Sequence, residues 1–215
     1  VVGITGSVGK TSTKEFIGGV LAVLWAFWQG KPNFMVMLFL IFVLRMLNRT
    51  SGDRHKIFDN VLLLLCAWWL GQDGGWLYPM MLGAAYIIES QLTNGCFYSL
   101  YLAALAFAAL YFSNGITKEP ALLNFYYIGL MATSIILFLP MLRMSVLVNA
   151  RGDRNGRRLD GKRLRASNLF FLVSVFFVSF FQGNAQAVNL APAMLTAAGV
   201  GFYLVYDFAH KKNNA

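Results

Sequence analysis

The chain has 215 residues, of which 58% are hydrophobic and only 13% are charged, and its formal net charge is +9 at pH 7. About a quarter of the residues of an ordinary soluble domain are charged, so this composition lacks the polar surface that a water-soluble fold needs. It favours an integral membrane protein. Nucleic acid is not needed to explain the net charge, because the basic residues sit beside apolar runs and not in a soluble groove-reading fold.

The N-terminal segment, residues 1–15, is predicted to be a short P-loop-like unit that precedes a transmembrane domain at 16–215. Residues 3–12 read GITGSVGKTS, which is a pattern of strand, glycine loop and helix start. Backbone N–H groups of such a loop can bind a phosphate, a lysine adds positive charge, and a threonine hydroxyl can bind Mg²⁺. The candidate nucleotide-binding residues are Gly6, Ser7, Gly9, Lys10 and Thr11.

This loop does not match the general P-loop pattern, because the position six residues before Lys10 is Ile4 and not glycine. It closely resembles the ATP-binding loop of the Mur ligases, in particular the type that adds D-Ala-D-Ala, over residues 1–17. The resemblance implies ATP and Mg²⁺ as cofactors. The rest of the chain lacks the soluble domains of that family. The segment is therefore interpreted as a remnant or an artefact of gene joining, as a cytoplasmic cap, or as a phosphate-binding loop.

Continuous apolar runs separated by short breaks rich in glycine, asparagine and charge predict an all-α bundle with about eight transmembrane helices. Strands are not expected, because the runs do not alternate with period two. The predicted spans are 16–29, 33–48, 57–71, 76–92, 96–113, 121–147, 167–182 and 187–208.

The distribution of lysine and arginine predicts the orientation of these spans. With both termini in the cytoplasm, 16 of the 18 basic residues lie inside, and only Lys31 and Lys118 lie outside. This agrees with the bias of cytoplasmic loops toward positive charge. The inside loops are then 45–56, 89–95 and 143–165. Anionic lipid headgroups at the cytoplasmic face are the expected partners of these basic loops.

Two of the inside loops also carry pairs of carboxylates. Asp53 and Asp59 lie in one loop, and Asp153 and Asp160 in the other. Paired carboxylates with nearby cations could hold Mg²⁺ and a lipid diphosphate, as in membrane prenyltransferases. The spacing is not that of a tight aspartate motif, and basic residues outnumber the aspartates. The alternative is that these loops only set the membrane topology.

Other chemistry-bearing residues are few. The two cysteines, Cys66 and Cys96, and the two histidines, His55 and His210, do not form a ligand pattern, so no metal site and no catalytic site are expected. Charged residues are scarce within the spans, where they would mark an ion path. Uncharged polar residues within the spans are expected to bond between helices.

These features predict a multi-pass protein of the bacterial inner membrane without an evident catalytic site. A small transporter, a channel-like protein or a subunit of a membrane complex of the cell envelope is the leading expectation, with membrane-protein partners or a homo-oligomer as the assembly. One alternative is a membrane enzyme that acts on a lipid-linked phosphate or diphosphate. Another is an ATP-binding protein related to the Mur ligases.

Overall fold

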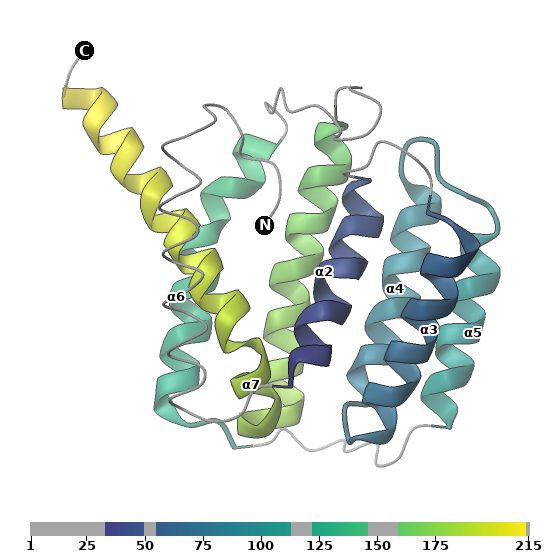
Figure 1. Ribbon diagram of the computed structural model, residues 1–215. Coiled ribbons are helices and arrows are strands. Elements are labelled where there is room, and N and C mark those ends of the chain that lie inside the picture. Colours follow the sequence, from purple (N-terminus) through teal and green to yellow (C-terminus); the bar gives the residue numbers. More distant parts are fainter. Residues whose placement is uncertain (1–32, 50–54, 113–121, 146–158, 214–215) are drawn as a thin grey trace.

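The computed structural model describes residues 33–49, 55–112, 122–145 and 159–213, and every regular element in these ranges is a helix (Figure 1). This confirms the all-α prediction for the described part of the chain. The N-terminal segment 1–15 and the first predicted span lie outside the described residues. The helices are α2 (Phe34–Asn48), α3 (Ile57–Gln72), α4 (Leu77–Gln91), α5 (Ser99–Tyr111), α6 (Phe125–Met144) and α7 (Gly161–Asn213).

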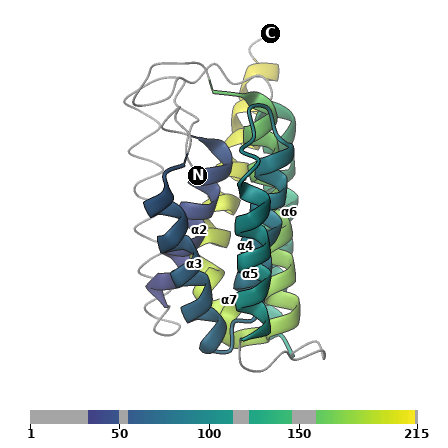
Figure 2. The ribbon, with the colours of Figure 1, turned by 90° about the vertical axis from the view of Figure 1, so that its right-hand side faces the viewer.

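The helices run side by side along one common direction (Figures 1 and 2). Helix α2 and the first half of α7 occupy the middle of the bundle. The group α3–α4–α5 packs on one side of them, and α6 with the second half of α7 packs on the other (Figure 1). The core between them is built from large apolar side chains such as Phe39, Leu82 and Met194, each fully buried.

Helix α7 is a hairpin of two helical arms. At Gly183 the backbone leaves the helical conformation, with φ 66° and ψ −155°. Glycine adopts this region without the steric cost that a Cβ would bring. Figure 1 shows the two arms meeting at one end of the bundle. The break therefore falls where the sequence 182–184 predicts a loop, and the arms correspond to the predicted spans 167–182 and 187–208.

The prediction of about eight membrane spans is not met by the lengths of the helices. Among the described residues, only Phe125–Met144 and Gly161–Tyr206 are long and apolar enough to cross a membrane. Helices α2, α3 and α5 are apolar but contain 15, 16 and 13 residues. At 1.5 Å per residue they extend about 20–24 Å, which is less than the hydrocarbon thickness of about 30 Å. The predicted runs at 33–48 and 57–71 are themselves this short, so they were counted as spans because they are apolar and not because of their length.

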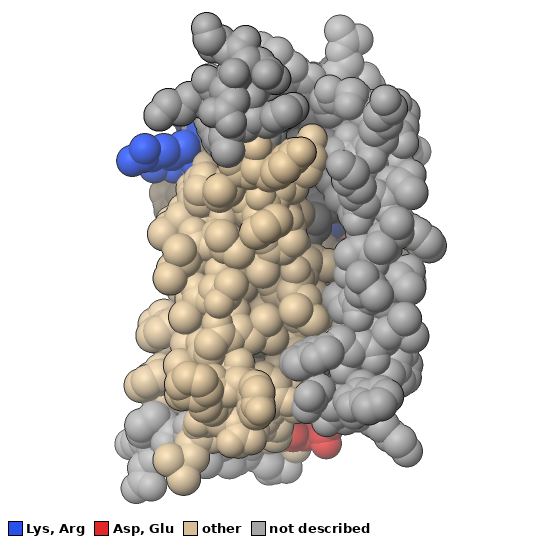
Figure 3. All heavy atoms as spheres, turned by 90° about the vertical axis from the view of Figure 1, so that its left-hand side faces the viewer, with Lys and Arg blue, Asp and Glu red and all other residues tan. Residues whose placement is uncertain are grey.

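Much of the described surface is apolar, as the core is. Large apolar side chains are exposed on all six described helices, whereas polar groups such as Glu89, Arg163 and Ser167 are buried. In the face drawn in Figure 3, the described surface is uncharged over most of its height, with lysine and arginine atoms near its upper end. Exposed residues, one or more from each helix, include Leu38, Ile41, Leu65, Trp69, Ile87, Leu105, Ile136, Phe176 and Phe202.

Candidate functional site: a buried charged cluster around Glu89

The two ends of the bundle differ in chemistry. We call "the charged end" the end where α2, α4 and α6 finish and α3, α5 and α7 begin. Exposed basic side chains gather there: Arg45, Lys56, Arg143, Lys162 and Arg165. The opposite end, "the amide end", is held by Asn and Gln side chains. The Asn184 side chain accepts a hydrogen bond from the Asn124 N–H at 2.7 Å, and Gln72 donates to the Phe112 carbonyl at 2.8 Å.

Glu89 is the centre of the charged end. It lies in the last turn of α4, and its side chain is fully buried. One carboxylate oxygen, Oε1, accepts a hydrogen bond from Arg49 Nη2 and lies 3.5 Å from Arg163 Nη1. The other, Oε2, accepts from the Ser99 hydroxyl at 2.8 Å and from the Cys96 N–H at 3.2 Å. The buried carboxylate is thus paired with charge on one oxygen and hydrogen-bonded on the other, which is the condition for burying it at all.

Arg49 reaches Glu89 because of the way α2 ends. Arg49 is the C-cap residue, its φ is 48°, and its N–H bonds to the Arg45 carbonyl at 2.9 Å. This left-handed conformation is uncommon for a residue with a side chain. The guanidinium also donates to the Asn94 carbonyl at 2.9 Å and contacts Cys96 Sγ at 3.7 Å. Arg49 therefore links the end of α2 to the turn between α4 and α5.

Arg163 links the start of α7 to the same turn. Its guanidinium is buried and donates twice to the Thr93 carbonyl, at 3.0 Å and 2.6 Å, and once to the Leu47 carbonyl at 3.4 Å. All three predicted inside loops, 45–56, 89–95 and 143–165, therefore meet at this cluster. Residues of the three loops lie far apart in the chain, and Glu89 is the shared partner.

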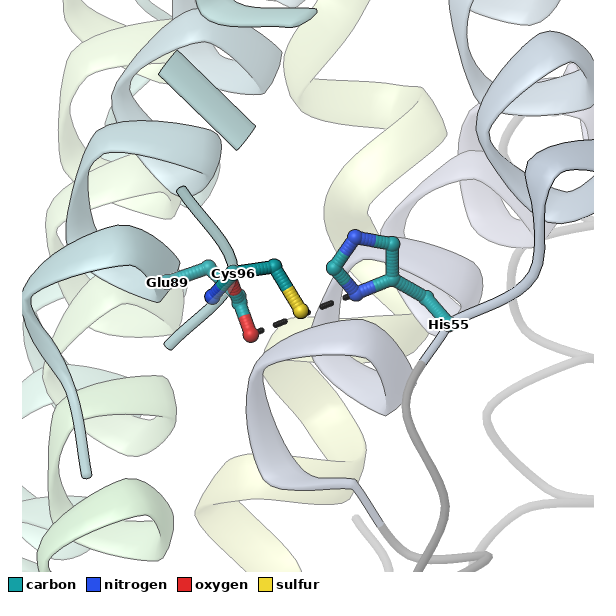
Figure 4. A group of neighbouring side chains, drawn as sticks. All are labelled: His55, Glu89 and Cys96. Atoms are coloured by element: carbon teal, nitrogen blue, oxygen red, sulfur yellow. Dashed lines mark hydrogen bonds and ion pairs between the residues drawn. The ribbon is translucent and has the colours of Figure 1, made fainter. Parts of the chain in front are cut away.

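His55 closes the cluster on the side of α3 (Figure 4). Its Nδ1 lies 4.0 Å from Glu89 Oε1, and its ring packs edge-on against Tyr98 with the ring centres 5.3 Å apart. The Tyr98 hydroxyl donates to the His55 carbonyl at 3.2 Å. Burial lowers the pKa of His55 below its ordinary value, although the Glu89 carboxylate opposes this shift. The imidazole is therefore neutral at pH 7.

Asp160 caps the first turn of α7 beside the cluster. Its Oδ1 accepts from the Lys162 N–H at 2.8 Å, and its Oδ2 accepts from the Thr93 hydroxyl. Burial alone would raise the pKa of Asp160, but these hydrogen bonds and the nearby Arg163 charge bring it below its usual value. Because the folded-state pKa is depressed, the stabilisation is present above the unfolded pKa and is lost as the pH falls through the folded one.

We therefore expect the free energy of unfolding to decrease as the pH falls below about 4. Asp160→Asn keeps a capping side chain but removes the titrating group, so its stability should change less between pH 5 and pH 3. Urea midpoints of both proteins at the two pH values measure this difference. An equal loss of stability in both proteins would show that Asp160 does not contribute to the pH dependence.

The residues predicted from sequence are only partly described. Gly6, Ser7, Gly9, Lys10 and Thr11 lie outside the described residues, as do Asp53 and Asp153. Asp59 lies at the start of α3, where its side chain accepts from the Lys56 N–H at 3.1 Å. Asp59 and Asp160 thus both lie at the charged end, and each holds the first turn of a helix.

The cluster itself was not predicted from the sequence. The sequence placed Glu89 at an inside end but gave it no partner, and it treated Cys96 and His55 as unconnected. One usable signal was present: Glu89 is an acidic residue at the end of an apolar run, beside a turn that the charge pattern places with the two basic loops. Such a charge needs a cationic partner from those loops.

Comparisons with protein-family models, curated proteins and solved structures found no match to this chain. The resemblance of residues 1–17 to the Mur ligase loop stays a prediction.

Proposed function

We propose that the chain is a multi-pass protein of the bacterial inner membrane and that it acts as a small transporter or channel-like protein. The observation that carries this proposal is the exposure of large apolar side chains on all six described helices. A soluble monomer rarely exposes contiguous apolar patches larger than a few hundred Å². Hydrocarbon is the solvent that suits the exposed side chains of α2, α3, α5 and α6.

The charge distribution supports the orientation that we propose, with the charged end in the cytoplasm. Its exposed basic residues can contact anionic headgroups. Cytoplasmic loops of membrane proteins are enriched in lysine and arginine, so the basic residues place this end in the cytoplasm in our proposal. In this proposal the described helices, including both arms of α7, are the spans. The shorter ones fit by local thinning of the bilayer, which costs a fraction of a kcal/mol per Å of mismatch.

Buried hydroxyl groups on the first arm of α7 support transport. Ser167, Ser174 and Ser179 are buried, and their hydroxyls have no hydrogen-bond partner among the described residues. Each such group costs about 1–3 kcal/mol if it stays dry. Ser167 and Ser174 also share the face of Arg163, because they follow it by four and eleven residues in the same helix. These hydroxyls offer hydrogen bonds to water or a small solute between the charged end and the amide end.

A second set of polar side chains lies at the amide end. The Tyr78 hydroxyl donates to Gln186 Oε1 at 2.8 Å, and Asn189 Nδ2 donates to the same oxygen at 2.9 Å. Asn189 Oδ1 accepts from the Asn33 N–H at 2.7 Å. None of these groups is charged, and the three serines are also neutral. A route of this kind suits a small neutral polar solute better than an ion.

Osmotic swelling of proteoliposomes with urea or glycerol tests this function. We expect faster swelling than in empty liposomes and a reduction of about tenfold in Ser174→Val, which replaces a hydroxyl by a bulkier apolar group. Thr196→Val is the matched control, because the Thr196 hydroxyl already bonds to the Pro192 and Ala193 carbonyls at 2.9 Å. Swelling equal to that of empty liposomes would reject transport of these solutes and favour a non-catalytic subunit of a membrane complex.

The enzymatic alternatives have less support from the described residues. A lipid diphosphate site requires free carboxylates that could share Mg²⁺, and Asp59 and Asp160 are used in helix capping. The guanidiniums of Arg49 and Arg163 are occupied by Glu89 and by backbone carbonyls. The ATP-binding alternative depends on residues 1–17, which lie outside the described residues.

A further inference from the structure

The imidazole of His55 is the least satisfied polar group of the charged end. Its side chain is only 4% exposed, and neither Nδ1 nor Nε2 has a hydrogen-bond partner among the described residues. A buried ring nitrogen usually has a partner, because leaving it without one costs about 1–3 kcal/mol. The imidazole contacts the rings of Tyr86 and Tyr98 through ring faces and edges, without a hydrogen bond from either ring nitrogen. The ring is therefore held in place while its nitrogens remain available.

Two further metal-ligand groups face this ring. The Cys96 thiol is free and buried, and the Glu89 carboxylate is fully buried. One ligand atom from each of His55, Glu89 and Cys96 lies within 4.8 Å of the other two. In Figure 4 the three side chains converge from different segments: the segment two residues before α3, the last turn of α4 and the turn before α5. Imidazole, thiolate and carboxylate are the three side-chain ligands that zinc prefers.

We propose that His55, Cys96 and Glu89 form a binding site for a zinc-class divalent cation. Bonds of 2.0–2.3 Å place the ligands of a tetrahedral zinc ion about 3.3–3.8 Å apart, so side-chain shifts of about 1 Å bring the present arrangement to bonding distance. The thiol proton leaves to solvent when the sulfur binds the metal. Three protein ligands leave one coordination position for water.

The two guanidiniums set the strength of this site. Arg49 and Arg163 both form ion pairs with Glu89 Oε1, and Arg49 also contacts the Cys96 sulfur. Their positive charges oppose a dication, and Glu89 must be shared between them and the metal. Ser99 and the Cys96 N–H keep Oε2 in place from the other side. His55 and Cys96 are consequently the ligands that should dominate the affinity.

Metal binding is measured on the full-length protein purified in detergent, with any polyhistidine tag removed. The probes are Zn²⁺ in competition with a chromophoric chelator and Co²⁺ by absorption spectroscopy. We expect one equivalent of Zn²⁺ with a Kd below about 10 µM and a thiolate-to-cobalt charge-transfer band. Cys96→Ser should abolish that band and weaken Zn²⁺ binding at least tenfold, and His55→Gln should weaken Zn²⁺ binding at least tenfold.

Cys66→Ser is the matched control, because Cys66 lies on α3, within an apolar helix and outside this group of ligands. It should bind both metals as the unchanged protein does. His55→Gln leaves the hydrogen bonds of Glu89 intact, so this variant should fold even if Cys96→Ser does not. Absence of stoichiometric binding, or equal binding in the unchanged protein and His55→Gln, would overturn the proposal.

Discussion

Glu89→Ala is expected to destabilise the protein more than any other single change at the charged end, by about 3–5 kcal/mol. The substitution leaves the buried guanidinium of Arg163 and the half-buried one of Arg49 without their counter-charge, and it removes the acceptor of the Ser99 hydroxyl and the Cys96 N–H. Breaking a buried ion pair by removing one partner costs far more than the pair contributes when intact. The expected result is a large drop in the thermal midpoint of the detergent-solubilised protein.

The matched control removes a carboxylate at the other end. Asp73 is exposed in the turn after α3, at the amide end. Asp73→Ala should change stability by less than about 0.5 kcal/mol, as surface substitutions usually do. A thermal midpoint for Glu89→Ala within a few degrees of that of Asp73→Ala would contradict the role of Glu89 in joining the three loops.

Gly201→Ala should be the most damaging glycine substitution in the second arm of α7. A Cβ at this position would lie 2.1 Å from the Leu137 carbonyl oxygen of α6, a backbone atom that cannot move aside without shifting the helix. Small residues let helices approach this closely in membrane bundles. We expect a loss of about 1–3 kcal/mol from overpacking, measured as a lower urea or thermal midpoint.

Gly199→Ala is the control for this substitution, two residues earlier in the same arm. A Cβ there meets nothing within 4 Å. Alanine is a better helix former than glycine by about 1 kcal/mol, so this variant should be unchanged or more stable. Equal destabilisation by the two substitutions would show that the close contact between α6 and α7 is absent.

Helix positions could be predicted from the sequence because they depend on local patterns. The apolar runs at 33–48 and 57–71 correspond to α2 and α3 within one residue at each end. The break at 182–184 was predicted from Gly183 and its polar neighbours, and the structure reverses the chain there. The predicted run at 96–113 extends beyond α5 at both ends, because hydropathy marks apolar residues but not where a short helix ends.

The candidate site could not be predicted in the same way. Arg49, Glu89 and Arg163 are separated by 40 residues or more, and no local pattern states that their side chains meet. The left-handed backbone at Arg49 directs that side chain to Glu89, and a left-handed conformation is not expected at arginine. The positive-inside pattern did place the three loops on one side, and that placement was the only sequence signal for their convergence.

The sidedness of the two ends tests the membrane proposal most directly. A cysteine introduced at the exposed position Asp73 or Lys162 can be labelled in intact cells with a membrane-impermeant maleimide. Cys66, which is half-buried, and Cys96, which is buried, serve as the background. We expect Asp73→Cys to react in intact cells and Lys162→Cys to react only after the cells are opened. Labelling of both positions from the same side, or recovery of the protein in the soluble fraction, would contradict a membrane bundle with a cytoplasmic charged end.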